Sequence, residues 1–181
     1  MNDESQVRIC VVGEPAVGKT TLIMRYTQDK FYEERVMTTA SLSHDFSKEI
    51  NNRLTKFVFL DTPGQQNYRT TALQFIKGCS VAFLMFKPSD EGSVNAIPEW
   101  IRAIKEKCNL DIILVASFID DEKEEALSKK VLDKYKNHID IKEVFGISSK
   151  TGIGLDELLY KVYDNIYVVP KQPQDQKKKC C

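Results

Sequence analysis

The sequence lacks an excess of charge of either sign, because 26 lysines and arginines balance 26 aspartates and glutamates. A chain without excess positive charge does not attract a polyanion such as DNA or RNA through its overall electrostatic field, so we expect no nucleic-acid partner. No apolar run approaches the length of a membrane span, and the polar segment Met1–Gln6 leads us to expect no signal peptide. With 181 residues and no internal repeat or linker, we expect one domain with its own core.

Cysteine is scarce within the body of the chain. Cys10, Cys79 and Cys108 stand in or beside apolar segments and lack the spacing of metal ligands. This pattern is typical of reduced core thiols in a cytosolic protein. Cys180 and Cys181 belong to a different segment, the C-terminal tail.

One stretch combines two glycines with a lysine and a threonine: Gly13-Glu14-Pro15-Ala16-Val17-Gly18-Lys19-Thr20. It follows the apolar run Val7–Val12 and leads into Thr21–Tyr26, which is the order of buried strand, loop and helix start. The spacing G-x-x-x-x-G-K-[ST] is that of a phosphate-binding loop. Gly13 and Gly18 allow backbone conformations in which successive N–H groups point into one concavity.

The same loop supplies the polar groups that a nucleotide phosphate requires. Amides from Ala16 to Thr21 and the positive end of the helix dipole favour an anion. Lys19 provides a mobile charge for the outer phosphates, and Thr20 provides a hydroxyl for Mg²⁺. A glycine-rich turn without a ligand is the alternative, but the strand and helix on either side favour a nucleotide site.

Apolar runs alternate with helix-period segments, which predicts an α/β fold with a mostly parallel sheet. The predicted strands are Val7–Val12, Leu42–Ile50, Phe57–Leu60, Val81–Phe86, Ile112–Ala116 and Val144–Ile147. The predicted helices are Thr20–Thr27, a segment near Thr70–Lys77, Ser93–Lys107, Glu122–Asn137 and Leu155–Tyr167. Asn51-Asn52-Arg53 favours a hairpin, so one edge strand should be antiparallel. Pro98 should lie in the first turn of its helix or kink it.

A second polar motif, Asp61-Thr62-Pro63-Gly64-Gln65, follows the predicted strand Phe57–Leu60. Ligands of open parallel sheets bind at the carboxyl ends of the strands. Asp61 can hold Mg²⁺ there, usually through a water, and Gly64 can bring an amide to a γ-phosphate. Gln65 can orient a water in line with that phosphate. An ordinary Asp-Thr-Pro-Gly turn is the alternative, and the phosphate loop upstream disfavours it.

With these motifs the chain resembles a small GTPase of the Ras superfamily, nearest the Rab branch. The resemblance runs without gaps from Val7 to about Trp100 and more loosely to Ile166. It implies the small G domain of the P-loop NTPase class, an α/β fold with a mostly parallel six-stranded sheet, one antiparallel edge strand and helices on both faces.

The resemblance also assigns residues that the motifs alone do not. It places the switch I threonine at Thr38, which in the family binds Mg²⁺ and senses the γ-phosphate. Phe31 falls where the family stacks an aromatic on the base. Ser148-Ser149-Lys150 resembles the S-A-K loop, in which the middle amide reads the guanine oxygen. The segment Ser93–Trp100 resembles the Rab third helix.

The base-binding motif departs from the family pattern N-K-x-D and reads Ser117-Phe118-Ile119-Asp120. Asp120 is in place to accept from the ring N–H and the amine of guanine. Ser117 replaces the asparagine that ties the base loop to the phosphate loop, and Phe118 replaces the lysine that packs over the base. Phe118 either stacks on the base or fills core at the strand end. We expect guanine to be preferred with weakened affinity, and we expect restored asparagine and lysine to slow GDP release.

Further departures surround the phosphates. Pro15 and Ala16 stand where Ras-like loops often carry glycine, and substitution there often slows hydrolysis in the family. We therefore expect slow turnover without an activating protein. Thr39–Ser43 does not match the Rab I-G-V-D-F signature, and Leu60 replaces the Rab tryptophan. The effector surface should accordingly be unusual.

Motifs and resemblance together define the predicted site. The predicted catalytic residues are Gln65, Lys19 and Thr38, and the predicted Mg²⁺ ligands are Thr20, Thr38 and Asp61. The residues expected to contact GTP or GDP are Gly13, Ala16, Val17, Gly18, Lys19, Thr20, Thr21, Phe31, Thr38, Gly64, Ser117, Phe118, Asp120, Ser148, Ser149 and Lys150.

The last residues form a polar, lysine-rich tail that cannot fold. We predict a G domain over residues 1–169 and a flexible tail over 170–181. The tail ends Lys177-Lys178-Lys179-Cys180-Cys181 and has no C-a-a-X box. Its two cysteines resemble the Rab signal for double geranylgeranylation, and two lipid chains anchor firmly where one anchors marginally. The lysines add attraction to an anionic leaflet. A solvated tail without lipid is the alternative.

The resemblance implies a Rab-like switch that hydrolyses GTP to GDP and regulates vesicle and membrane trafficking. Effectors should bind at switch I, around Thr38, and switch II, from Asp61 to about Thr71. An exchange factor, a GTPase-activating protein, a prenylation escort and a dissociation inhibitor are the other expected partners. The expected location is the cytoplasmic face of intracellular membranes, with cycling through the cytosol.

Two other classes of function were weighed on the same residues. One is a nucleotide-binding interaction module, a pseudo-GTPase with weakened guanine specificity or little turnover, which Ser117, Phe118 and Pro15 favour. The other is a small-molecule kinase, which is disfavoured because nothing in the sequence supplies an acceptor-binding lid.

Overall fold

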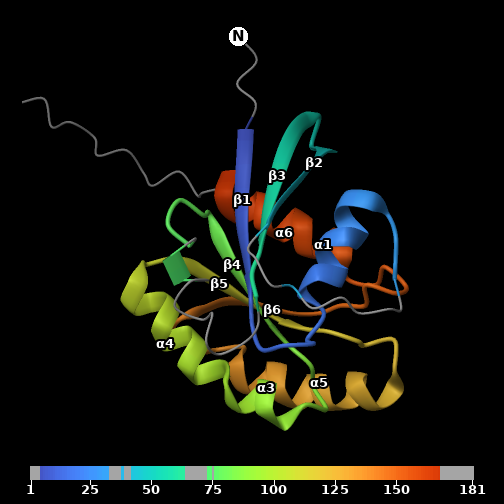
Figure 1. Ribbon diagram of the computed structural model, residues 1–181, viewed down its shortest axis with the longest axis vertical. Coiled ribbons are helices and arrows are strands. Elements are labelled where there is room, and N and C mark those ends of the chain that lie inside the picture. The colour runs from blue at the N-terminus through green and yellow to red at the C-terminus, as the bar shows by residue number, and fades with distance from the viewer. Residues whose placement is uncertain (1–4, 33–37, 39–41, 64–72, 75, 168–181) are drawn as a thin grey trace, which may run out of the picture.

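The computed structural model describes residues 5–32, 38, 42–63, 73–74 and 76–167. They form one six-stranded sheet, in the order β2-β3-β1-β4-β5-β6, with helices on both faces (Figure 1). The strands are β1 (Ser5–Val12), β2 (Leu42–Ile50), β3 (Arg53–Asp61), β4 (Val81–Phe86), β5 (Asp111–Ala116) and β6 (Ile141–Gly146). The helices are α1 (Lys19–Gln28), α3 (Glu91–Asn95), α4 (Ile97–Lys107), α5 (Glu122–Tyr135) and α6 (Leu155–Tyr167).

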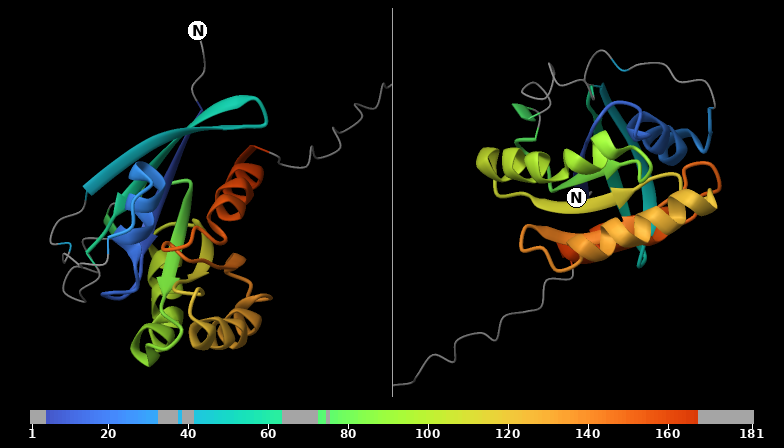
Figure 2. Two further views of the ribbon diagram at one scale, coloured as in Figure 1. Left: turned by 90° about the vertical axis from the view of Figure 1, so that its right-hand side faces the viewer. Right: turned by 90° about the horizontal axis from the view of Figure 1, so that it is seen from below.

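All strand pairs are parallel except β2 with β3, which confirms the predicted antiparallel edge. The hairpin turn is tighter than predicted, because Ile50 already pairs with Arg53 and only Asn51 and Asn52 lie between them. Both asparagines have positive φ, 52° and 59°, as a two-residue type I′ turn requires. Figure 2 (left) shows this hairpin along one edge of the molecule, next to α1.

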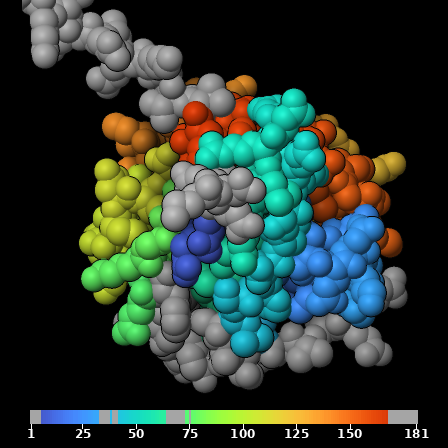
Figure 3. Space-filling model, turned by 90° about the horizontal axis from the view of Figure 1, so that it is seen from above, coloured from blue at the N-terminus to red at the C-terminus, as the bar shows by residue number. Residues whose placement is uncertain are grey.

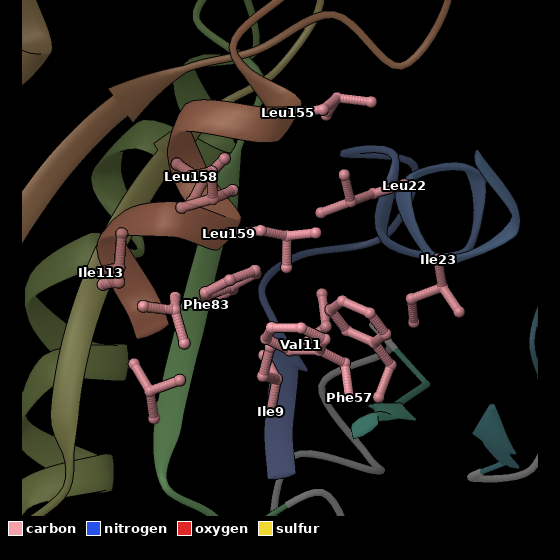
Figure 4. Close-up of a cluster of buried hydrophobic side chains, with 14 of the residues drawn as sticks. Ile9, Val11, Leu22, Ile23, Phe57, Phe83, Ile113, Leu155, Leu158 and Leu159 are labelled. Atoms are coloured by element: carbon pink, nitrogen blue, oxygen red, sulfur yellow. The ribbon is translucent and has the colours of Figure 1, made fainter. Parts of the chain in front are cut away.

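Alternation along the strands produces two cores, one on each face of the sheet. Ile9 and Val11 of β1 face a cluster that includes residues of α1 and α6, which Figure 4 shows in close-up. Cys10 and Val12 face the opposite cluster, which includes residues of α4 and α5. Since successive side chains of a strand point to opposite faces, one strand contributes to both cores. In Figure 1, α3, α4 and α5 accordingly lie apart from α1 and α6.

Aromatic stacking joins α1 to the hairpin. The centre of the Tyr26 ring lies 5.8 Å from that of Phe46 and 5.2 Å from that of Phe59, and both rings are nearly parallel to it. The Tyr26 hydroxyl donates to the carbonyl oxygen of Leu155 at the start of α6, at 2.7 Å. These contacts fix α1, whose first residue is Lys19, against both the sheet and α6.

The β2 strand shows how an edge of the sheet is left open to water. Its residues alternate between exposed and half-buried, and the exposed ones include Ser43, Asp45, Ser47 and Glu49. Charged side chains on an edge discourage pairing with a further strand. Figure 3 shows the hairpin as a cyan band at the surface beside the blue α1. Among the helices that the structure describes, none is both long enough and apolar enough to cross a membrane.

The predicted elements are largely confirmed, with one correction. The helix predicted over Ser93–Lys107 is two helices, α3 and α4, which meet at Ala96. Pro98 lies in the first turn of α4, where a missing N–H costs no helical bond, whereas in one continuous helix it would remove one. Strands β3 and β6 begin earlier than predicted, at Arg53 and Ile141. Half of the predicted helix near Thr70–Lys77, namely residues 70–72 and 75, lies outside the described residues.

Cys10, Cys79 and Cys108 are not joined by disulfides in the part of the chain that the structure describes. Cys10 is buried, and Cys79 and Cys108 are half-buried. A hydrogen bond with Cys79, together with burial, raises the pKa of the Cys10 thiol.

Candidate nucleotide-binding site

The polar loops of the chain gather at one edge of the sheet. These loops follow β1, β3, β4, β5 and β6. Because these five strands are parallel to one another, their carboxyl ends all lie at the same edge of the sheet. This is the position at which open parallel sheets bind ligands.

The phosphate loop packs tightly against the neighbouring strand. Gly13 has φ of 138°, and a Cβ at this position would lie 2.2 Å from the carbonyl oxygen of Met85 in β4. No other residue fits there without a shift of the backbone. Gly18, with φ of 95°, precedes α1 and provides no side-chain cap for its first amides. Uncapped amides at a helix start are available to an anion.

Lys19 reaches back across this loop. Its Nζ donates to the carbonyl oxygens of Gly13 and Glu14, at 2.9 and 2.8 Å, and its side chain is 6 % exposed. Burial lowers the pKa of Lys19 to about 8, against the opposing effect of the Asp61 and Glu14 carboxylates. An anion beside this ammonium would counter the cost of burying it.

Three oxygen-bearing side chains meet beside Lys19. The Thr20 hydroxyl donates to Asp61 Oδ2 at 2.7 Å and lies 2.8 Å from the Thr38 hydroxyl. The Thr38 hydroxyl lies 3.5 Å from the same carboxylate oxygen. The structure thus brings together all three predicted Mg²⁺ ligands, from α1, β3 and the segment between α1 and β2.

The Asp61 carboxylate is incompletely satisfied. Asp61 is 1 % exposed, and its Oδ1 is buried without a hydrogen-bond partner. Burial raises the pKa of Asp61, while the bond from Thr20, the Lys19 charge, His44 and the bond from Thr38 lower it. A buried carboxylate oxygen beside two hydroxyls is a donor set that suits a hard cation such as Mg²⁺. The residues present therefore fit the metal that the motifs predict.

The two predicted base loops are also brought together. Asp120, which is exposed, accepts a hydrogen bond from the hydroxyl of the buried Ser148 at 2.7 Å. The same hydroxyl accepts from the backbone N–H of Thr151 at 3.1 Å, and the Ile119 amide donates to the Ile147 carbonyl. These bonds hold the loop after β5 against the loop after β6. Ser149 is half-buried and Lys150 is exposed in that second loop.

Ser117 and Phe118 adopt arrangements that the sequence motif did not predict. The Ser117 hydroxyl and amide both lie 3.0 Å from the carbonyl oxygen of Phe86, the last residue of β4. Phe118 has φ of 65°, and its ring lies next to Gly18 of the phosphate loop. The Lys87 Nζ stands 5.2 Å from the centre of this ring.

The remaining predicted residues divide into two groups. Val17 is fully buried in the core, so only its backbone can contact a ligand. Ala16 is exposed with φ of 61°, and Thr21 and Phe31 are half-buried. Gly64, Gln65, Cys180 and Cys181 lie outside the described residues.

Sequence reasoning missed a contact between the phosphate loop and α4. The Trp100 indole Nε1–H donates to Glu14 Oε1 at 2.9 Å, and Trp100 is 1 % exposed. Beside this contact a cavity of about 560 Å³ opens between the phosphate loop, α3 and the start of α4. Its lining comprises Glu14, Pro15, Asp90, Gly92, Ser93, Asn95, Ala96 and Glu99. No motif signals the contact, because its partners lie on different elements far apart in the chain.

Comparison with known proteins agrees with this geometry. A sequence model of the Ras family matches residues 8–168. Among similar proteins, human Ras-related protein Rab-3A is 29 % identical over 170 residues, covering 91 % of this chain and 76 % of that protein. RabG2 of Dictyostelium discoideum is 25 % identical, covering 92 % and 85 %, and mouse Rab-21 is 26 % identical, covering 83 % and 68 %.

The fold and the clustered phosphate, hydroxyl–carboxylate and base loops define a small G domain. The chain belongs to the Ras family, as a divergent small GTPase of the Rab branch. Members of this class bind guanine nucleotides, hydrolyse GTP and act as switches.

The close approach of Gly13 to Met85 predicts a specific cost. Gly13→Ala should lower the free energy of unfolding by about 2–4 kcal/mol, because it adds a clash to an unfavourable φ. Gly78→Ala is the matched control, since Gly78 also has positive φ but has open space around its missing Cβ. It should cost only about 1–2 kcal/mol. Denaturant unfolding without nucleotide, followed by the fluorescence of the single Trp100, measures both. Equal losses would contradict the packing argument.

Proposed function

We propose that this chain is a Rab-like GTP-binding switch that regulates vesicle and membrane trafficking. The observation that carries the proposal is the contact of Thr38 with the hydroxyl–carboxylate cluster, 2.8 Å from Thr20 and 3.5 Å from Asp61. Thr38 is half-buried and lies in the sequence between α1 and β2, so the state of the phosphate site is coupled to the predicted switch I. Such a loop is the element that a GTPase orders with GTP and releases on hydrolysis.

The phosphates would be held by the loop between β1 and α1. Backbone amides from Ala16 to Thr21 would donate to them, and Lys19 would exchange its bonds to Gly13 and Glu14 for bonds to the outer phosphates. Thr20, Thr38 and Asp61 would hold Mg²⁺, with Asp61 using the oxygen that now lacks a partner. When bound, Mg²⁺ neutralises the charge that develops on the phosphates.

The base would be selected by the paired loops after β5 and β6. The Ser148 bond presents the Asp120 carboxylate at the site, where it can accept from two donors of guanine. Adenine offers an acceptor at the ring position, so it would leave the carboxylate unpaired. The remaining expected contacts are those of Phe31 and of the loop residues Ser149 and Lys150.

Hydrolysis is assigned to Gln65, with Lys19 and Thr38 stabilising the phosphates and Gly64 contributing an amide. Turnover should be slow without an activating protein, because Pro15 and Ala16 replace glycines beside the outer phosphate. Proline removes one amide donor there.

The C-terminal segment, 170–181, would act as a basic, flexible tail beyond a G domain of residues 1–169. We propose lipidation of Cys180 and Cys181, attachment to the cytoplasmic face of intracellular membranes and cycling through the cytosol. Two lipid chains attach a protein firmly to a membrane, whereas a single lipid chain attaches it reversibly. Effectors at the two switches, an exchange factor, a GTPase-activating protein, an escort and a dissociation inhibitor would complete the cycle. Fractionation of a Cys180→Ser, Cys181→Ser variant tests the anchor, since parental membrane retention would contradict it.

A second candidate function is a binding module with little turnover. It is favoured by the Ser117 hydroxyl, which bonds to Phe86 in β4, and by the phosphate-loop proline. Nucleotide preference and turnover of the purified protein separate the two candidates.

Base selection gives the principal prediction. The parent should bind GTP at least about a hundredfold more tightly than ATP, and Asp120→Asn should shift preference from GTP to XTP, because the xanthine carbonyl accepts where the guanine amine donates. Asp121→Asn is the matched control: this neighbouring carboxylate caps α5 by accepting from the Lys123 and Glu124 amides. Asparagine is an equally good cap, so that variant should keep the parental preference. Equal ATP and GTP affinities in the parent, or an unchanged preference in Asp120→Asn, would overturn the guanine assignment.

The catalytic assignment of Gln65 predicts a change in rate without a change in affinity. Gln65→Leu should bind GTP as the parent does, because the phosphates are held elsewhere, and should hydrolyse it roughly tenfold more slowly or worse. Single-turnover assays with purified protein measure both quantities. Equal hydrolysis rates would remove Gln65 from the catalytic machinery.

A further inference from the structure

Phe118 occupies an unusual backbone conformation at the base loop. Its φ of 65° lies in the left-handed region, which bulky residues rarely adopt. The conformation brings the ring to the phosphate loop, where two of its carbons lie 3.7 Å from the position of a Cβ built on Gly18. The ring therefore reaches from the loop after β5 to Gly18, the residue that precedes α1. Strain of this kind persists only where surrounding contacts hold it.

One of those contacts is the side chain of Lys87. Phe86 and Ala116 are paired residues at the ends of β4 and β5, so the residues that follow them lie side by side. The Lys87 Nζ stands 5.2 Å from the centre of the Phe118 ring, within the range of a cation–π contact. The lysine charge that the family carries within the base motif is here supplied by the residue that follows β4.

Lys87 is itself held from α5. Its Nζ lies 3.6 Å from Glu124 Oε1, and the Glu124 residue is 7 % exposed. The other oxygen of Glu124 accepts from the Ser89 amide at 2.8 Å, and the Ser89 hydroxyl donates to Oε1. A buried carboxylate with these bonds is a fixed anchor, so the ammonium has a defined place over the ring.

Ser117 cannot take over this linking role with the bonds it makes. Its hydroxyl donates to the Phe86 carbonyl, which directs it toward β4. The base motif reaches the phosphate loop at Gly18, where two carbons of the Phe118 ring lie 3.7 Å from a built Cβ and the Ser117 Cβ lies 3.9 Å from it, so the ring makes the closer contact. Loss of that contact would free the base loop from the loop that holds the phosphates.

We propose that Phe118 and Lys87 form the clamp between the base loop and the phosphate loop, and that this clamp sets the rate of guanine-nucleotide release. The inference rests on the proposed function and deepens it. Phe118 contacts the nucleotide-binding loop directly, and Lys87 is a positioning residue that acts through the Phe118 ring. Glu124 fixes Lys87.

The clamp changes what a restored family motif should do. Phe118→Lys alone would place a second ammonium beside Lys87, and like charges in close contact repel. It should therefore speed GDP release, contrary to the expectation drawn from the motif. Replacing Lys87 with Met removes the repulsion between the two ammonium groups. The variant that combines Phe118→Lys with Lys87→Met should therefore release GDP more slowly than Phe118→Lys alone.

The test is release of fluorescently labelled GDP from the purified full chain. Lys87→Met should release GDP roughly two- to tenfold faster than the parent, whereas Lys87→Arg, which keeps a cation able to stack on the ring, should stay within about twofold. The control is Lys129→Met, which removes an exposed α5 lysine paired with Glu125 and should leave release unchanged.

A double-mutant comparison separates positioning from a general structural effect. Lys87→Met should have no further effect on release in a Phe118→Ala background, because the ring through which it acts is gone. The same acceleration in both backgrounds, or parental release by Lys87→Met, would overturn the clamp while leaving GTP binding intact. A parent chain that binds no guanine nucleotide would overturn the proposed function, and the clamp with it.

Discussion

Two buried opposite charges, one at the start of α1 and one at the end of β3, govern this structure. Lys19 is 6 % exposed and Asp61 is 1 % exposed, and burial disfavours the charged form of each. The protein compensates only in part: Lys19 bonds to two backbone carbonyls, and one Asp61 oxygen has no partner. An anion beside Lys19 and a cation beside Asp61 would complete both environments, which is the charge pattern of a nucleotide with Mg²⁺.

The order of the strands places Lys19 and Asp61 next to each other. The sheet order puts β1 between β3 and β4, so the loop carrying Lys19 and the strand end carrying Asp61 are neighbours. Gly13 approaches Met85 so closely that only glycine fits between the loop and β4. The base loops are set further along the same edge, where the Phe118 ring reaches the phosphate loop and Lys87, the residue after β4, lies over that ring. The molecule thus keeps the sheet and the loop positions of the family, but a different pair of residues connects the base loop to the phosphate loop.

Periodicity and motifs predicted most of the framework from the sequence. Leu42–Ile50, Val81–Phe86 and Leu155–Tyr167 have the predicted bounds, because each has a clear apolar pattern between turn residues. The break at Ala96 was missed because Pro98 is compatible with either a helix start or a kink. The contacts of Trp100 with Glu14 and of Lys87 with Phe118 could not be predicted, since they join residues distant in sequence through side-chain geometry. The motif predicted that Phe118 lies in the base loop, but it did not predict the positive φ that turns its ring toward the phosphate loop.

The most direct test of this account is the affinity of the purified chain for GDP in Mg²⁺ and in EDTA. Mg²⁺ should tighten binding by at least about tenfold in the parent, and Asp61→Asn, which keeps the shape but removes the charge, should lose most of that dependence. Asp45→Asn removes an exposed carboxylate paired with Lys56 and should behave as the parent does. An affinity for GDP that is the same in Mg²⁺ and EDTA, or an equal Mg²⁺ dependence in Asp61→Asn, would contradict it.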